Sequence, residues 1–210
     1  MVLLLLLLAS PMPATVAYSP SIAKSPAPIV VSAPTKQATS TTTSVPFYSQ
    51  FKDISSPSWQ KVGCGIASLA MIVDYYGPGV SVDTLLSEGI KKGAYDKSAG
   101  WTYAGLVNVS KKYGLAGTWY SVSGSGKTAS LAKLEKSVTS GPVIASVHYK
   151  LEPTNPIPHL IVVTGMKNGY VYYNDPANSS GGRKIATDAF YKAWKGRYIV
   201  IRPTTALATI

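Results

Sequence analysis

The segment Cys64–Gly77 has the clearest helical pattern in the chain. Its apolar residues recur at three- and four-residue spacing, at Ile66, Leu69, Ala70, Val73 and Tyr76. This spacing places them on one stripe of a helix with 3.6 residues per turn, and Gly77-Pro78 is a stop signal. We therefore predict a helix that begins at Cys64 and is buried along its length.

Helices also dominate the segments that follow. Ser81 is a suitable N-cap for a short helix, and another helix is predicted over about residues 102–113, with Gly114 as its C-cap. A strand is predicted at Thr118–Val122. The next helix should have Leu131, Leu134 and Val138 on one face.

The second half of the chain has a strand-like pattern. Runs of β-branched and aromatic residues, bounded by turn residues, occupy residues 143–149, 159–165, 170–174 and 198–202, with an amphipathic helix near residues 187–194. Helices followed by antiparallel strands are typical of an α+β fold with two segregated halves. We therefore expect an N-terminal helical half packed on a C-terminal antiparallel sheet.

Composition separates this domain from the N-terminal part of the chain. The sequence has 210 residues, 46% of them hydrophobic, which suffices for one domain with a sizeable core. The apolar run Val2–Ala9 is too short to span a bilayer and is followed by small residues, which predicts a signal peptide over residues 1–17. We assign residues 18–44, rich in Ser, Thr and Pro, to a linker, residues 45–203 to the domain and residues 204–210 to a tail. The expected location is therefore outside the cytoplasm, either secreted or at the cell surface.

The charge of the chain favours anionic partners. The formal net charge is +11, which favours contact with anionic surfaces such as a cell-wall polymer, although the scattered basic residues fit general solubility better than specific binding to a polyanion. The basic residues are scattered and lack interleaved aromatic residues, so no nucleic-acid partner is expected. Gly126-Lys127-Thr128 is reminiscent of a phosphate-binding loop, but Ser121 stands where that loop requires a glycine. We therefore expect a flexible turn before a helix at this place, and no bound nucleotide.

Cys64 is the single cysteine of the chain and the first residue of the predicted helix. Unpaired backbone N–H groups and the positive end of the helix dipole favour a thiolate at that position, and the thiolate is the nucleophilic form. Free cysteine is also among the residue types most often buried in cores. The position alone therefore fits a nucleophile and a core thiol equally well.

A nucleophilic thiol needs a base and a third group that orients the base. His159 opens one predicted strand and Asp175 closes the next, so both lie at the same end of a hairpin. His148 is the rival base, but no acidic residue is expected across a hairpin from it. His159 has an alternative interpretation too, as a loop-edge histidine that caps a strand.

The length of the hairpin loop decides whether His159 and Asp175 can meet. A two-residue loop at Asn168-Gly169 would pair Asp175 with Val162 and turn it away from His159, because side chains alternate along a strand. A three-residue loop with Gly169 left-handed would place Asp175 on the face that His159 uses. We therefore predict the three-residue loop, Lys167–Gly169, or another odd loop.

Several segments carry a resemblance to a known family. They are "VPFYSQ", "CGIASLAMIVDYYG", "GPVIASV", "HLIVVTG", "GYVYYNDP" and "YIVI". In this order they resemble secreted members of the bacteriocin-processing (double-glycine) peptidase-like group, family thirty-nine of the cysteine peptidases, over about residues 45–202. The resemblance implies a papain-like fold, with Cys64 as the nucleophile, His159 as the general base and Asp175 as the residue that orients it. No cofactor is expected for this chemistry.

The family also has a glutamine upstream of the cysteine, whose amide helps to stabilise the oxyanion. Gln50, in "VPFYSQ", matches this position best. Gln60 is the second candidate, because it lies closer to Cys64 than the family spacing suggests.

The resemblance leaves the substrate open. Founding members of the family sit on membrane exporters and cut leader peptides after a glycine pair, but neither the membrane helices nor a nucleotide-binding domain is expected in this sequence. What the resemblance implies is hydrolysis of a peptide or protein substrate through a Cys64 thioester. The alternatives are the same chemistry on a cell-wall peptide, and a non-catalytic surface-binding module on a flexible stalk.

Overall fold

The computed structural model describes residues 44–207 of the chain. The predicted signal peptide and all but the last residue of the predicted linker lie outside the described residues, so both stay predictions. Within residues 44–207, no helix combines the length and the apolar character needed to cross a membrane.

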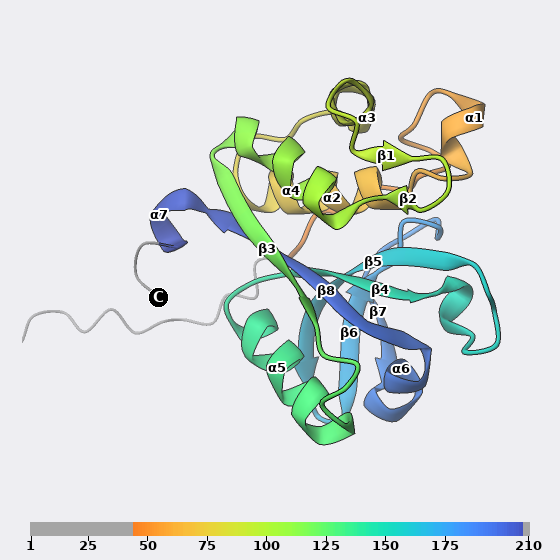
Figure 1. Ribbon diagram of the computed structural model, residues 1–210, viewed down its shortest axis with the longest axis vertical. Helices are drawn as coiled ribbons and strands as arrows, with labels where there is room; N and C mark the ends of the chain where they lie inside the picture. The colour runs from red at the N-terminus through yellow and green to blue at the C-terminus, as the bar shows by residue number, and fades with distance from the viewer. Residues whose placement is uncertain (1–43, 208–210) are drawn as a thin grey trace, which may run out of the picture. The chain divides into compact units, whose positions relative to one another are not determined.

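The helical elements come first along the chain (Figure 1). They are α1 (Pro57–Gln60), α2 (Cys64–Tyr76), α3 (Val82–Lys91), the short strands β1 (Tyr95–Asp96) and β2 (Gly100–Trp101), α4 (Tyr103–Ser110) and the 3₁₀ helix η1 (Lys111–Tyr113). The sheet half follows. It consists of β3 (Leu115–Ser121), α5 (Lys127–Thr139), β4 (Val143–His148), η2 (Tyr149–Leu151), β5 (Pro158–Lys167), β6 (Tyr170–Asn174), β7 (Arg183–Ala186), α6 (Thr187–Ala193), β8 (Trp194–Pro203) and α7 (Thr204–Leu207).

The six long strands form one antiparallel sheet in the order β3-β8-β4-β5-β6-β7. One face of the sheet packs against the helical half, and α5 and α6 lie against the other face (Figure 1). Alternation along β5 divides its side chains accordingly, with Leu160 and Val162 in the first core and Ile161 and Val163 in the second. The predicted α+β architecture is confirmed.

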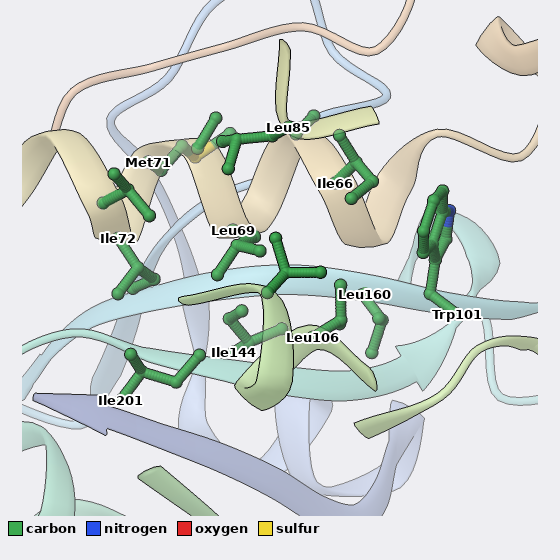
Figure 2. Packing of buried hydrophobic residues seen from close by; sticks show 14 of the residues in the cluster. Ile66, Leu69, Met71, Ile72, Leu85, Trp101, Leu106, Ile144, Leu160 and Ile201 are labelled. Carbon is green, nitrogen blue, oxygen red and sulfur yellow. The ribbon is translucent and has the colours of Figure 1, made fainter. Parts of the chain in front are cut away.

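Helix α2 is the centre of the first core. It begins at Cys64 and ends where Gly77 leaves the helix, and residues 65–73 are all buried, so burial extends beyond the predicted stripe. Figure 2 shows Leu69 and Ile72 on the sheet side of this helix, above Ile144, while Ile66 lies near Leu85 and Trp101. Each such side chain stabilises the fold by about 1.5–3 kcal/mol, so α2 is firmly anchored to the sheet.

The predicted helix ends are confirmed. Ser81 caps α3 by accepting a hydrogen bond from the backbone N–H of Thr84, and Thr102 caps α4 in the same way through Gly105. Gly114 closes η1 with a left-handed φ of 71°. Gly126, with φ of 73°, forms the turn expected before α5.

Three features of the sheet half and its neighbourhood were not predicted. The strand β7 is mostly exposed at the sheet edge and therefore lacks an apolar run, and β1 and β2 have only two residues each. Strand β8 begins at Trp194, inside the segment assigned to a helix, because α6 ends at Ala193 and a register shift lets the chain rejoin β4.

Candidate active site

Cys64 stands at the first position of α2, as predicted, and is half-buried. The loop before it is held in two ways. The Trp101 side-chain N–H donates a hydrogen bond to the Val62 carbonyl at 2.8 Å. A Cβ atom on Gly63 would lie 2.2 Å from the Ile54 side chain, so any larger residue would force Ile54 to shift. The thiol is thus presented from a fixed loop at a helix N-terminus.

His159 and Asp175 meet in a buried contact. The His159 Nε2 atom lies 2.6 Å from the Asp175 Oδ1 atom, and both residues are about 5% exposed or less. The same carboxylate oxygen accepts the Ala177 backbone N–H at 2.9 Å, which fixes its position. Because Nε2 is engaged by Asp175, Nδ1 is the ring nitrogen left to take a proton from the Cys64 thiol.

The hairpin that brings these residues together differs from the prediction. Lys167 pairs with Tyr170, so the loop has only the two residues Asn168 and Gly169, both with positive φ. The prediction of a three-residue loop is therefore wrong. Asn-Gly is the preferred pair for a two-residue turn with two left-handed residues, and this local preference decides the loop length.

A β-bulge in β5 contains the extra residue that was expected in the loop. Val163 pairs with Tyr173 and Gly165 with Tyr172, so Thr164 has no partner. Val162 then pairs with Asn174, and the same register carried one residue further sets Asp175 opposite Ile161. The face predicted for Asp175 is therefore the one it occupies, although the surplus residue lies in the strand and not in the loop.

The electrostatics of the pair favour a charged imidazole. Burial acts to lower the pKa of His159, but the hydrogen bonds to Asp175 and Cys64 and the negative charges of these two groups outweigh it and raise the pKa to about 9. The Tyr149 ring packs edge-on against the His159 ring, with centroids 5.2 Å apart, and covers the imidazole on another side. Near neutral pH the arrangement therefore favours an imidazolium beside the Cys64 sulfur and the Asp175 carboxylate.

The rival histidine lies elsewhere. His148 ends β4, and its Nδ1 atom lies 2.6 Å from the Asn155 backbone carbonyl oxygen. Among residues 44–207, the hydrogen-bond partner of His148 is thus a backbone group and not a carboxylate. The structure brings His159, and not His148, into the cavity that contains Cys64.

The two glutamines have different surroundings. Gln50 is buried, lines the cavity with Cys64, and donates a hydrogen bond from its side-chain Nε2 to the Gln60 carbonyl at 2.7 Å. Its backbone N–H donates to the carbonyl of Pro176, the residue after Asp175. The Gln60 side chain instead donates to the Ile54 carbonyl and is not part of the cavity lining. One amide N–H of Gln50 is therefore left for a substrate oxygen.

Gln50, Cys64 and His159 line one cavity of about 500 Å³. Besides Gln50, Cys64 and His159, its lining comes from the loop before α2, from the β1–β2 hairpin, and from the ends of β4 and β5. Within residues 44–207, no group of three or more His, Cys, Asp or Glu side chains is arranged to hold a metal ion. The functional groups that the site brings together are a thiol, an imidazole, a carboxylate and an amide.

Comparison with known proteins decides the family. Residues 42–202 match the Peptidase_C39 like family. The chain belongs to this family. The predicted class, a cysteine-type peptidase with the papain-like fold, is thereby confirmed.

Individual relatives of this C39-like chain include one curated protein and several solved structures. It is 31% identical over 141 residues to the pediocin PA-1 transport/processing ATP-binding protein PedD of Pediococcus acidilactici; the match covers 67% of this chain but only 17% of PedD. A double glycine motif protease from an AMS/PCAT transporter, solved in complex with the leader peptide, is 25% identical with a TM-score of 0.54, covering 77% of this chain and 94% of that one. A putative C39-like peptidase from Bacillus anthracis has the same fold, at 23% identity and a TM-score of 0.55, covering 75% and 94%.

Sequence reasoning missed one wall of this C39-like site. Tyr95 and Trp101 of the β1–β2 hairpin and Tyr149 of η2 line the cavity, but none had been singled out. The hairpin is too short to give an alternating pattern. The available signal was the cluster of aromatic residues close to glycines between residues 95 and 103.

Proposed function

We propose that this chain is an active peptidase that cleaves peptide bonds through a thioester on Cys64. The observation that carries this proposal is the buried 2.6 Å contact between His159 and Asp175, which lies at the cavity that also contains the thiol. A core thiol would not need a charged histidine beside it, because a buried ionisable pair is costly to maintain without a use.

In the acylation step, His159 already holds the thiol proton as an imidazolium, and the Cys64 thiolate sulfur attacks the carbonyl carbon of the scissile amide. The C–S bond forms while the carbonyl π electrons move to the oxygen. We assign stabilisation of this oxyanion to the free amide N–H of Gln50 and the backbone N–H groups at the start of α2. Collapse of the intermediate breaks the C–N bond, and the imidazolium gives its proton to the leaving amine.

Deacylation reverses the roles. Water gives a proton to His159 and attacks the thioester carbonyl, the C–S bond breaks, and the thiolate and a free carboxyl group result. Asp175 holds Nε2 throughout, so that Nδ1 stays directed to the sulfur.

The test uses the folded domain and a general protein substrate such as casein. Cys64→Ala is expected to lower the cleavage rate by several orders of magnitude with an unchanged circular dichroism spectrum. Undiminished cleavage by this variant would contradict the proposal. Iodoacetamide labelling of the parent gives a second reading, because a non-catalytic surface module would leave Cys64 unlabelled at neutral pH.

We further propose that the peptidase acts outside the cytoplasm, with a cell-wall peptide as the second candidate substrate. The support is the apolar run Val2–Ala9 with the small residues after it, and the net charge of +11, which suits an anionic wall polymer. Mass spectrometry of the mature N-terminus would test removal of about residues 1–17. Parallel incubation with peptidoglycan fragments and casein would separate the two substrates.

A further inference from the structure

We propose that the cavity beside Cys64 selects a large apolar side chain of the substrate and rejects basic ones. This inference rests on the proposed peptidase function and goes further by naming the substrate class. The relative solved with its leader peptide is described as a double glycine motif protease. The cavity of the present chain is built for a different side chain.

The size of the cavity argues against glycine as its occupant. Its volume of about 500 Å³ falls in the range of small-molecule sites, about 300–1,000 Å³. A glycine would leave this space to water, whereas a branched or aromatic side chain would fill part of it and remove apolar surface from contact with water. The free energy gained favours the larger residue.

The walls of the cavity are apolar and come from separate segments. The side chains that form them include Tyr95, Trp101, Tyr103, Tyr149, Ile157 and Leu160. Ile157 is 55% exposed, so its apolar surface is free for contact with a substrate side chain. An apolar side chain would cover it.

The inner wall is already fixed. Besides its hydrogen bond to Val62, the Trp101 ring meets Tyr95 edge-on, with centroids 5.2 Å apart. A Cβ atom on Gly65 or Gly89 would lie within 2.7 Å of Trp101 atoms, so α2 and α3 press directly on this side chain. Since the side chains of this wall are already ordered before a ligand binds, little conformational entropy is lost on binding.

A small residue keeps the cavity open on the sheet side. Ser146 of β4 lies opposite Leu160, is 4% exposed and lines the cavity. A larger residue at this position would project into the space. Ser146 is therefore the position at which the size of the accepted side chain can be changed.

The charge around the cavity argues against basic occupants. No Asp or Glu is among the described residues that line it, whereas Lys61 lies at its exposed rim. A lysine or arginine side chain would be desolvated there without a counter-charge and next to a like charge. Apolar side chains carry no such cost.

The position of the cavity limits which substrate residue it can receive. Cys64 and His159 both line it, so it begins at the reacting atoms. An extended peptide advances about 3.3–3.6 Å per residue, and the side chain concerned must belong to a residue within two positions of the scissile bond.

The test measures kcat/KM for short internally quenched peptides that vary one position at a time around the scissile bond. We expect one position, within two residues of the scissile bond, at which kcat/KM for the Leu or Phe peptide exceeds that for the Gly peptide by about 100-fold or more. The Lys peptide should have the lowest kcat/KM. Products are mapped by mass spectrometry. A preference for glycine at every such position, or no preference, would overturn the inference and leave the peptidase function standing.

Two variants locate the preference in the cavity. Ser146→Leu is expected to lower kcat/KM for the Leu and Phe peptides by at least about tenfold, while cleavage of the Gly and Ala peptides persists. Lys61→Glu is expected to raise cleavage of the Lys peptide relative to its matched control, Lys61→Gln. Since Lys61 is exposed, this pair does not depend on repacking a buried site. Unchanged selectivity in both folded variants would contradict the inference.

A binding measurement separates the two proposals. The Cys64→Ala protein is titrated with the Leu and Gly peptides by isothermal calorimetry, and the Leu peptide is expected to bind more tightly. Absence of cleavage and of iodoacetamide labelling in the parent would refute the peptidase function. The binding preference would still show which side chain the cavity selects. Equal binding of both peptides would overturn the inference.

Discussion

The His159 imidazole and the Asp175 carboxylate lie on neighbouring strands with 2.6 Å between Nε2 and Oδ1. They share a face because β5 accommodates Thr164 as an unpaired residue between Val163 and Gly165. If Thr164 were paired instead, the two-residue turn would place Asp175 opposite Val162, on the other face. The geometry of the site thus requires that Thr164, which lies between the turn and the histidine, stay out of the strand pairing.

Deletion of Thr164 tests this relationship. The residues on either side already pair with Tyr173 and Tyr172, so the deletion closes the ladder without changing any partner. We expect the variant to retain kcat/KM within about tenfold of the parent, because a bulge is a surplus residue whose loss restores regular pairing.

Deletion of Val171 from the partner strand is the matched comparison. Strand β6 has no surplus residue there, so this deletion is expected to move Asp175 out of reach of His159 and abolish cleavage. Circular dichroism checks that both proteins are folded. A folded Thr164 deletion without activity would contradict the role assigned to the bulge.

The raised pKa of His159 predicts a pH-dependent stability. A histidine whose pKa is raised in the folded state contributes stability that is fully present below its unfolded pKa of about 6.5. This contribution is lost as the pH rises through the folded pKa of about 9. At about 1.4 kcal/mol per unit, the loss is on the order of 3 kcal/mol in the free energy of unfolding.

Asp175→Asn is expected to move this loss to lower pH, because the neutral amide stabilises the imidazolium less than the carboxylate does. Urea unfolding across the range measures the difference between parent and variant. The alkaline limb of kcat/KM should move in the same direction, since the imidazolium protonates the leaving amine. His148→Gln serves as the control and should keep the parental profile. An Asp175→Asn profile identical to that of the parent would argue against the assigned cause.

The two glutamines can be distinguished by kinetics. Gln50→Ala is expected to lower kcat by about 10²–10³, the usual cost of removing one oxyanion donor. Iodoacetamide labelling of Cys64 should change little, because alkylation of the thiolate forms no oxyanion. Gln60→Ala removes only the hydrogen bond to the Ile54 carbonyl and should cost less than about tenfold in kcat. An equal or larger loss in Gln60→Ala would reverse the assignment.

Gly65→Ala tests the close contact between α2 and Trp101. The new Cβ atom would lie 2.6 Å from the Trp101 Cβ atom, so the two elements must separate. We expect the free energy of unfolding to fall by about 1–3 kcal/mol, although alanine is the better helix former. Because Trp101 holds the Val62 carbonyl, kcat/KM should fall as well.

Gly124→Ala is the control for this substitution. A Cβ atom there would meet nothing within 4 Å, so urea unfolding should differ from the parent by no more than about 0.5 kcal/mol. Equal stability of both variants would contradict the contact described for Gly65.

The amino-acid sequence by itself determined the elements that depend on local interactions. The α2 helix and its starting residue follow from apolar spacing and from Gly77-Pro78, and the caps Ser81 and Gly114 follow from side-chain and backbone preferences of single residues. The family motifs likewise singled out Cys64, His159 and Gln50, which line one cavity, and Asp175, which contacts His159.

Only the tertiary structure decided where the surplus residue of the hairpin lies. Asn168-Gly169 favours a two-residue turn, while Ile161 and Val163 must enter one core and Leu160 and Val162 the other. Both demands are met only if one residue leaves the ladder, and the sequence pattern does not say which. The same holds for the cavity, because its walls come from segments far apart in the chain whose contacts form only when the two halves pack together.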